Sequence, residues 1–74
     1  MRVLTAVRAE VTRVPVHADS NFELDLGLDS MERVELLASL EARFGVRVPE
    51  ELAQSAFTVR DLAAAFAQAT GGEA

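Results

Sequence analysis

Apolar residues recur at steps of three and four through much of this chain, and this spacing constrains its fold more than any other feature. Because such steps place apolar side chains on one face of a helix, we expect helices over residues 3–14, 30–44 and 58–69. Pro49 opens a shorter helical stretch, 50–54, since proline is favoured at the first helical position. The pattern therefore predicts an all-α fold, a small four-helix bundle of three main helices and one short helix.

Residues at the ends of these stretches support the predicted helices. Asp29 and Glu32 have the spacing of a capping box before the helix 30–44, and Gly45 follows that helix as a C-cap. Pro15 stops the first helix, and Thr58 caps the last. The predicted apolar stripe of the first helix is Leu4, Val7, Val11 and Val14, and the predicted buried stripe of the helix 30–44 is Val34, Leu37, Leu40 and Phe44.

A long first loop, residues 15–29, separates the first two predicted helices. Connections of this length in a small domain are often functional. Gly27 provides the freedom for a turn just before the next helix. The loop also contains apolar residues, some of which should hold it to the core: Phe22, Leu24, Leu26 and Leu28.

The size and charge of the chain exclude several classes of function. Its 74 residues predict one domain, 1–74, which is too small for a core and a deep active site together. Without cysteine, and with His17 as the one histidine, the chain offers no metal cage, so we expect no metal site. It has no lysine and no long apolar run, which argues against nucleic-acid and membrane partners. We expect a cytoplasmic location, since the chain does not begin with a hydrophobic signal region. We also expect a monomer.

Acidic residues are concentrated in the middle of the chain. The net charge is −5, and residues 16–45 carry seven acids against Arg33 and Arg43. An acidic surface of this kind favours a partner with basic residues. The charge distribution alone is therefore compatible with a non-catalytic helical interaction module.

Ser30 is the residue with the most informative position. It begins a predicted helix directly after a glycine-containing turn, where the free amides of the helix favour a bound phosphate. A simpler interpretation is that Ser30 only caps the helix. A hydrolase would need a base and an oxyanion hole, but His17 is the one imidazole and the Gly-x-Ser-x-Gly motif is absent. Ser30 is thus either a cap or the acceptor of a group that another protein transfers.

The chain resembles the acyl carrier protein family along nearly its whole length. The match consists of an ordered set of residues with family-like spacing: Phe22 to Leu26, Gly27, Asp29-Ser30-Met31, Val34-Glu35-Leu36, Phe44, Pro49 and Thr58-Val59. The resemblance implies a four-helix carrier domain that catalyses nothing itself. It implies that Ser30 carries a 4′-phosphopantetheine arm, which a separate phosphopantetheinyl transferase installs from coenzyme A with a divalent metal.

The resemblance also assigns a partner surface to the helix 30–44. The arm would hold acyl intermediates as thioesters and present them to loading, condensing or transferring enzymes with basic patches. The residues expected to dock these enzymes are Asp29, Met31, Glu32, Glu35 and Glu41. Fatty-acyl, polyketide and related cargo all remain open. The alternative is the acidic interaction module without an arm.

Overall fold

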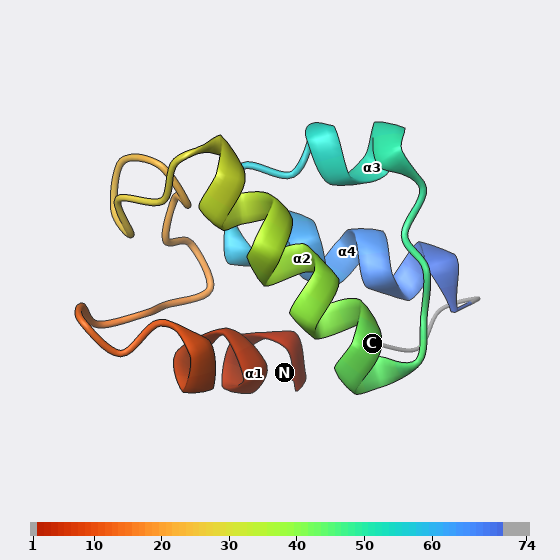
Figure 1. Ribbon diagram of the computed structural model, residues 1–74, viewed down its shortest axis with the longest axis horizontal. Helices are drawn as coiled ribbons and strands as arrows, with labels where there is room; N and C mark the ends of the chain where they lie inside the picture. The colour runs from red at the N-terminus through yellow and green to blue at the C-terminus, as the bar shows by residue number, and fades with distance from the viewer. Residues whose placement is uncertain (1, 71–74) are drawn as a thin grey trace.

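Four helices and their connections make up the structure, a computed structural model in which residues 2–70 are described. The helices are α1 (Arg2–Glu10), α2 (Ser30–Phe44), α3 (Glu50–Gln54) and α4 (Val59–Ala69). α1 packs against α4 and α2, and α3 packs against α4, as Figure 1 shows. No strand occurs among the described residues, where one isolated bridge joins Asn21 to Thr58. The all-α prediction is confirmed.

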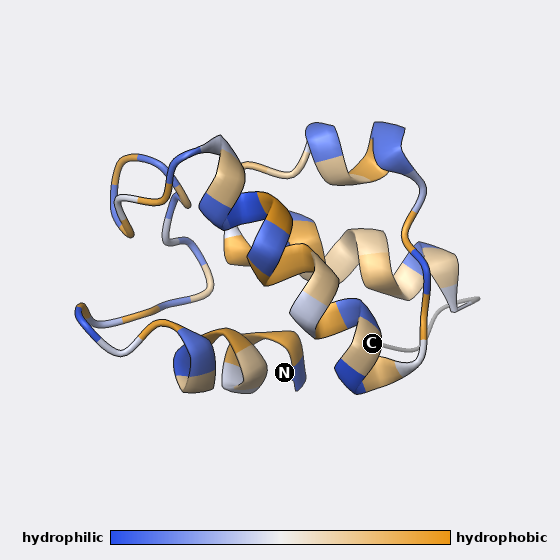
Figure 2. Cartoon of the chain, viewed as in Figure 1, coloured by the Kyte–Doolittle hydropathy of each residue, from blue (hydrophilic) through white to orange (hydrophobic). Residues whose placement is uncertain are grey.

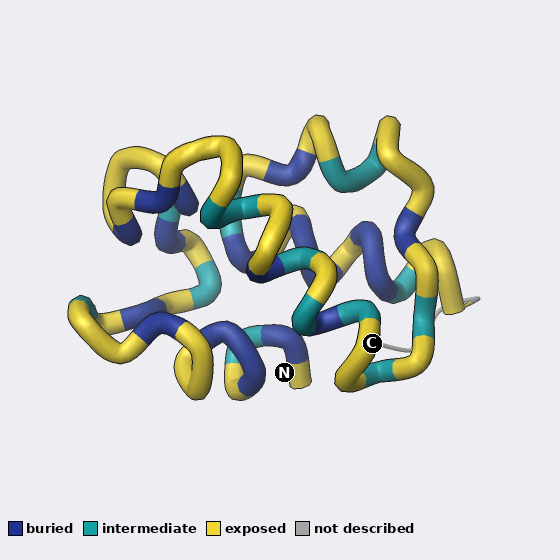
Figure 3. The backbone as a smooth tube through the Cα atoms, viewed as in Figure 1, coloured by how far each residue is buried: buried dark blue, intermediate teal, exposed yellow. Residues whose placement is uncertain are grey.

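The core combines residues from three helices and from the long first loop. Its largest fully buried side chains are Phe66, Leu26, Leu40, Val3, Val7 and Val59. In Figure 2 the apolar faces of the helices turn toward one another, and the buried segments of Figure 3 follow the same faces. Phe44 packs edge-on against Phe66, with ring centroids 5.5 Å apart. A small hydrophobic core therefore fixes α2 relative to α4.

Both ends of α2 are defined by the residues that the sequence predicts. Asp29 is the N-cap: its Oδ1 accepts a hydrogen bond from the Glu32 amide at 2.8 Å, and Glu32 Oε1 accepts one from the Asp29 amide at 3.2 Å. Gly45 ends the helix in the left-handed region, with φ at +66°. Thr58 and Asp61 form the same reciprocal capping box at the start of α4. Local sequence thus places the first residue of α2 at Ser30.

The long first loop is held against the start of α4 by backbone hydrogen bonds. The Phe22 amide donates to the Phe57 carbonyl at 2.9 Å, and the Val59 amide donates to the Ser20 carbonyl at 3.2 Å. Three of its four apolar residues are buried and hold the loop to the core, as expected of some of them: Phe22, Leu26 and Leu28. Leu24 is 84% exposed and does not anchor the loop. The loop is therefore held in place by these contacts, and it leads directly into the start of α2.

The first helix is shorter than its apolar period predicts. The sequence favours residues 3–14, whereas α1 ends at Glu10. The Val11 amide still donates to the Val7 carbonyl at 2.8 Å, but residues beyond it leave the helix. Val14 precedes Pro15, and a residue before proline avoids the helical region, the more so when it is β-branched. Val11 is buried although it lies outside the helix. At this position the apolar spacing therefore predicted burial correctly but not helical backbone.

The buried stripe of α2 also differs from the predicted one. Val34 is 63% exposed, while Leu36 and Leu40 are buried. Leu37 and Phe44 are half-buried and pack against the edge of the core. Apolar residues cover more of the surface of α2 than the core of so small a domain can bury. α1 packs against α2, Leu36 and Leu40 belong to the core, and Val34 is left at the rim of an open cavity.

Candidate functional site around Ser30

Ser30 is the first residue of α2, and it is exposed. Its hydroxyl makes no hydrogen bond to any described residue. Asp29 caps the helix instead, so capping does not explain the presence of Ser30. The result is an accessible hydroxyl next to the unpaired amides at the positive end of a fifteen-residue helix.

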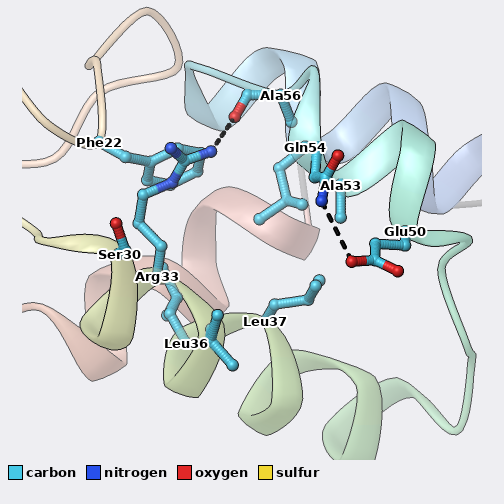
Figure 4. A pocket seen from close by; sticks show the side chains of 11 residues that line it. Phe22, Ser30, Arg33, Leu36, Leu37, Glu50, Ala53, Gln54 and Ala56 are labelled. Atoms are coloured by element: carbon cyan, nitrogen blue, oxygen red, sulfur yellow. Dashed lines mark hydrogen bonds between the residues drawn. The ribbon is translucent and has the colours of Figure 1, made fainter.

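A cavity of about 350 Å³ opens between α2 and α3, with Ser30 among the residues that line it. Figure 4 shows its side chains. Its walls are mainly apolar: Phe22, Val34, Leu36, Leu37, Ala53, Ala56 and Leu62. Glu50 and Gln54 line it from α3 and are joined by a hydrogen bond of 3.1 Å. A group attached at Ser30 would thus begin beside an apolar hollow.

Arg33 is a site residue that the sequence reasoning missed. Its Nη2 donates to the Ala56 carbonyl at 2.8 Å, and its guanidinium carbon lies 5.8 Å from the centroid of the Phe22 ring, within cation–π range. It lines the cavity between α2 and α3 and a second hollow between Ser30 and the first loop. Its position three residues after Ser30, on the same helical face, was the available signal.

The acids near Ser30 have different surroundings. Asp29 and Glu32 are engaged in the capping box, and Glu32 also lies 3.9 Å from Arg13 in an exposed ion pair. Glu35 is exposed and has no hydrogen bond or ion pair within residues 2–70. Met31 is 69% exposed. Thus Met31 and Glu35 are the two expected docking residues that carry no structural contact of their own.

Glu41 has a structural contact at the far end of α2. Its Oε2 accepts a hydrogen bond from the Val48 amide at 2.7 Å, which ties the connection after α2 back to the helix. Glu41 lies eleven residues beyond Ser30, roughly 16 Å along a helix that rises about 1.5 Å per residue. This contact could not be predicted from helical spacing, because the acceptor lies on α2 and the donor lies in the connection after it.

Several apolar side chains are exposed, two of them within the first five residues of α2. The large ones are Leu24, Met31, Val34 and Phe57. They come from the first loop, from α2 and from the segment before α4, and the hydrogen bond between Phe22 and Phe57 holds the loop beside that segment. Exposed apolar groups among acids are typical of protein-binding surfaces.

His17 is exposed in the first loop and has no hydrogen bond to Ser30. Its backbone amide donates to Ser20 Oγ at 2.9 Å. No group of three or more His, Asp or Glu within residues 2–70 could hold a metal ion. None of the described helices is long and apolar enough to cross a membrane.

The family model for a phosphopantetheine attachment site matches residues 2–66 of the chain. Similar curated proteins include an acyl carrier protein of Streptomyces coelicolor, 39% identical over 97% of this chain and 78% of its own length. Another is an acyl carrier protein of Treponema pallidum, 41% identical over 82% of this chain and 78% of its own length. A third, from Prochlorococcus marinus, is 46% identical over 77% of this chain and 70% of its own length.

The chain therefore belongs to the phosphopantetheine attachment site family, and it is a carrier rather than an enzyme. Its cofactor is covalently attached 4′-phosphopantetheine. The surroundings of Ser30 fit this group, because an exposed hydroxyl without a hydrogen-bond partner in the described chain is free to form a phosphodiester. The adjacent helix amides and Arg33 provide donors and positive charge beside a phosphate.

Proposed function

We propose that the chain is an acyl carrier whose arm is attached at Ser30. The observation that supports this most directly is the division of tasks at the start of α2: Asp29 caps the helix by accepting a hydrogen bond from the Glu32 amide, and the Ser30 hydroxyl is left exposed and unpaired within the described residues. When bound, the arm supplies a thiol that holds an acyl group as a thioester. A phosphopantetheinyl transferase installs the arm, and biosynthetic enzymes load and use it.

The chain's own residues present the arm. The capping box fixes the start of α2, and the first loop holds that start against α4 through Phe22. Because the attachment residue belongs to a packed helix, the base of the arm has a defined position, while the arm itself reaches the partner enzymes. A tethered thioester also has a high effective concentration at each enzyme that docks the carrier.

The partner enzymes dock on the exposed face of α2 beside Ser30. Met31 supplies an apolar contact, and Glu35 supplies a charge for a basic patch on the partner. Asp29 and Glu32 add negative charge, although both also cap the helix. Glu41 contributes less to docking, because its carboxylate accepts a hydrogen bond from the Val48 amide. The carrier acts as a cytoplasmic monomer without nucleic-acid or membrane partners, which agrees with its net charge of −5.

Attachment at Ser30 is tested with purified apo-protein, coenzyme A, Mg²⁺ and a transferase of broad specificity. We expect the intact mass of the wild type to rise by the mass of the arm, and Ser30→Ala to show no increase. Ser55→Ala is the matched control, because Ser55 is another exposed serine, at the end of α3. An unmodified wild type, or a Ser30→Ala variant that still gains the arm, contradicts the proposal.

A further inference from the structure

Arg33 is the one basic side chain among the residues that line the cavity between α2 and α3. Seven apolar side chains form most of the wall, and Glu50 and Gln54 are paired with each other on α3. Figure 4 shows the Arg33 guanidinium at the edge of the cavity, between the Phe22 ring and the Ala56 carbonyl. A cation therefore borders a mainly apolar hollow, one helical turn from the attachment residue.

The guanidinium is only partly satisfied by the protein. Of its five N–H donors, one has a protein acceptor in the described chain, the Ala56 carbonyl at 2.8 Å. The Phe22 ring covers one face of the group without accepting a conventional hydrogen bond. The remaining donors depend on water, or on a ligand with oxygen atoms.

We propose that Arg33 is a specificity-determining residue that favours short acyl groups with an oxo oxygen near the thioester over saturated acyl groups of equal length. The inference rests on the proposed attachment at Ser30. A saturated chain that enters the cavity removes water from the guanidinium and offers it no acceptor, which is costly for a charged group. An oxo oxygen accepts a charge-assisted hydrogen bond at the same place.

The size of the cavity agrees with a short cargo. Its volume of about 350 Å³ is at the lower end of the range of about 300–1,000 Å³ that is usual for small-molecule sites. Ser30 and Arg33 both line this cavity, so an arm that folds back from Ser30 along it would bring the thioester end beside the guanidinium. Arg33 would thus act on the first few atoms of the chain beyond the thioester.

The test compares hexanoyl and 3-oxohexanoyl groups loaded onto the wild type through the arm. For each cargo, the rate of acyl transfer to added dithiothreitol is measured on the protein and on free acyl-pantetheine, and the ratio of the two rates is its protection factor. We expect the 3-oxohexanoyl protection factor to exceed the hexanoyl one by about ten- to hundredfold, the effect of a hydrogen bond to a charged group. Equal factors on the wild type overturn the inference.

Arg33→Met removes the donors and keeps the length of the side chain, so the preference should disappear or reverse. Arg43→Met is the matched control, since Arg43 is an exposed arginine on α2 outside this cavity, and it should keep the wild-type preference. A preference that survives Arg33→Met, or is lost equally in Arg43→Met, contradicts the role of Arg33.

A second measurement on the wild type does not depend on the folding of a variant. The Arg33 Nε–H resonance should shift on loading with 3-oxohexanoyl and stay in place with hexanoyl. A resonance that is the same in both loaded forms overturns the inference. Failure of loading itself, seen as no gain in mass, instead contradicts attachment at Ser30, so the two proposals fail in different ways.

Discussion

Asp29 and Ser30 are neighbours in sequence with separate tasks. Both residue types are good N-caps, so the sequence left open which of them caps α2. The structure places Asp29 in the extended conformation of an N-cap, with its carboxylate bonded to the Glu32 amide. Ser30 is the first helical residue, where a side-chain cap is no longer needed. Stability and attachment at the start of α2 therefore depend on adjacent but different side chains.

This division predicts different stabilities for two alanine variants. Asp29→Ala removes the capping hydrogen bond and should lower the free energy of unfolding by about 0.5–2 kcal/mol. Ser30→Ala breaks no hydrogen bond within the described residues and should change it by less than about 0.5 kcal/mol. Urea unfolding followed by circular dichroism measures both. A Ser30→Ala variant as unstable as Asp29→Ala would mean that Ser30 is the cap after all.

At the scale of the element, α2 serves the core and the surface at once. Leu36 and Leu40 are buried in the core, and Met31 and Glu35 are exposed to solvent. Val34 and Leu37 border the cavity toward α3. A single helix thus carries the attachment residue, the proposed docking face and one wall of the cavity, and Ser30 is itself part of that wall.

The docking face predicts an electrostatic effect on partner enzymes. Glu35→Arg should raise the Kd for the transferase by about two- to tenfold at low salt, and added salt should reduce the difference. Glu51→Arg is the control with the same charge change, because Glu51 is an exposed acid on α3. Binding measured by titration at two salt concentrations distinguishes them. Equal weakening by both variants would indicate a general charge effect rather than a docking residue.

At the scale of the whole molecule, stability depends on few large side chains. The chain contains no cysteine, so no disulfide contributes, and a domain of this length has a small core. The first loop contributes Phe22, Leu26 and Leu28 to that core, alongside residues of the helices. A loss of core packing at any one helix should therefore unfold the domain cooperatively, loop included.

Two leucines test this dependence. Leu40 is fully buried in α2, whereas Leu24 is 84% exposed in the first loop. Leu40→Ala should lower the free energy of unfolding by about 2–5 kcal/mol, because it removes buried methyl groups and leaves a cavity. Leu24→Ala should change it by less than about 0.5 kcal/mol. Thermal and urea unfolding measure both, and similar losses in the two variants would contradict the assignment of the core.

Helix ends that depend on adjacent residues could be predicted from the sequence. Asp29 with Glu32 and Gly45 defined α2 correctly, and Thr58 defined the start of α4. The apolar period was less reliable, because it reports which residues are buried and not which backbone they have. It extended α1 beyond Glu10, since Val11 and Val14 continue the period outside a helix.

The sequence by itself determined the all-α fold, both ends of α2 and the special position of Ser30, because capping and periodicity are interactions between residues close in the chain. The tertiary structure decided which apolar residues of α2 are buried, since burial depends on where α1, α3 and α4 lie. It also decided the contacts of Arg33 with Ala56 and of Glu41 with Val48. These contacts join different elements, so they exist only once the chain has folded.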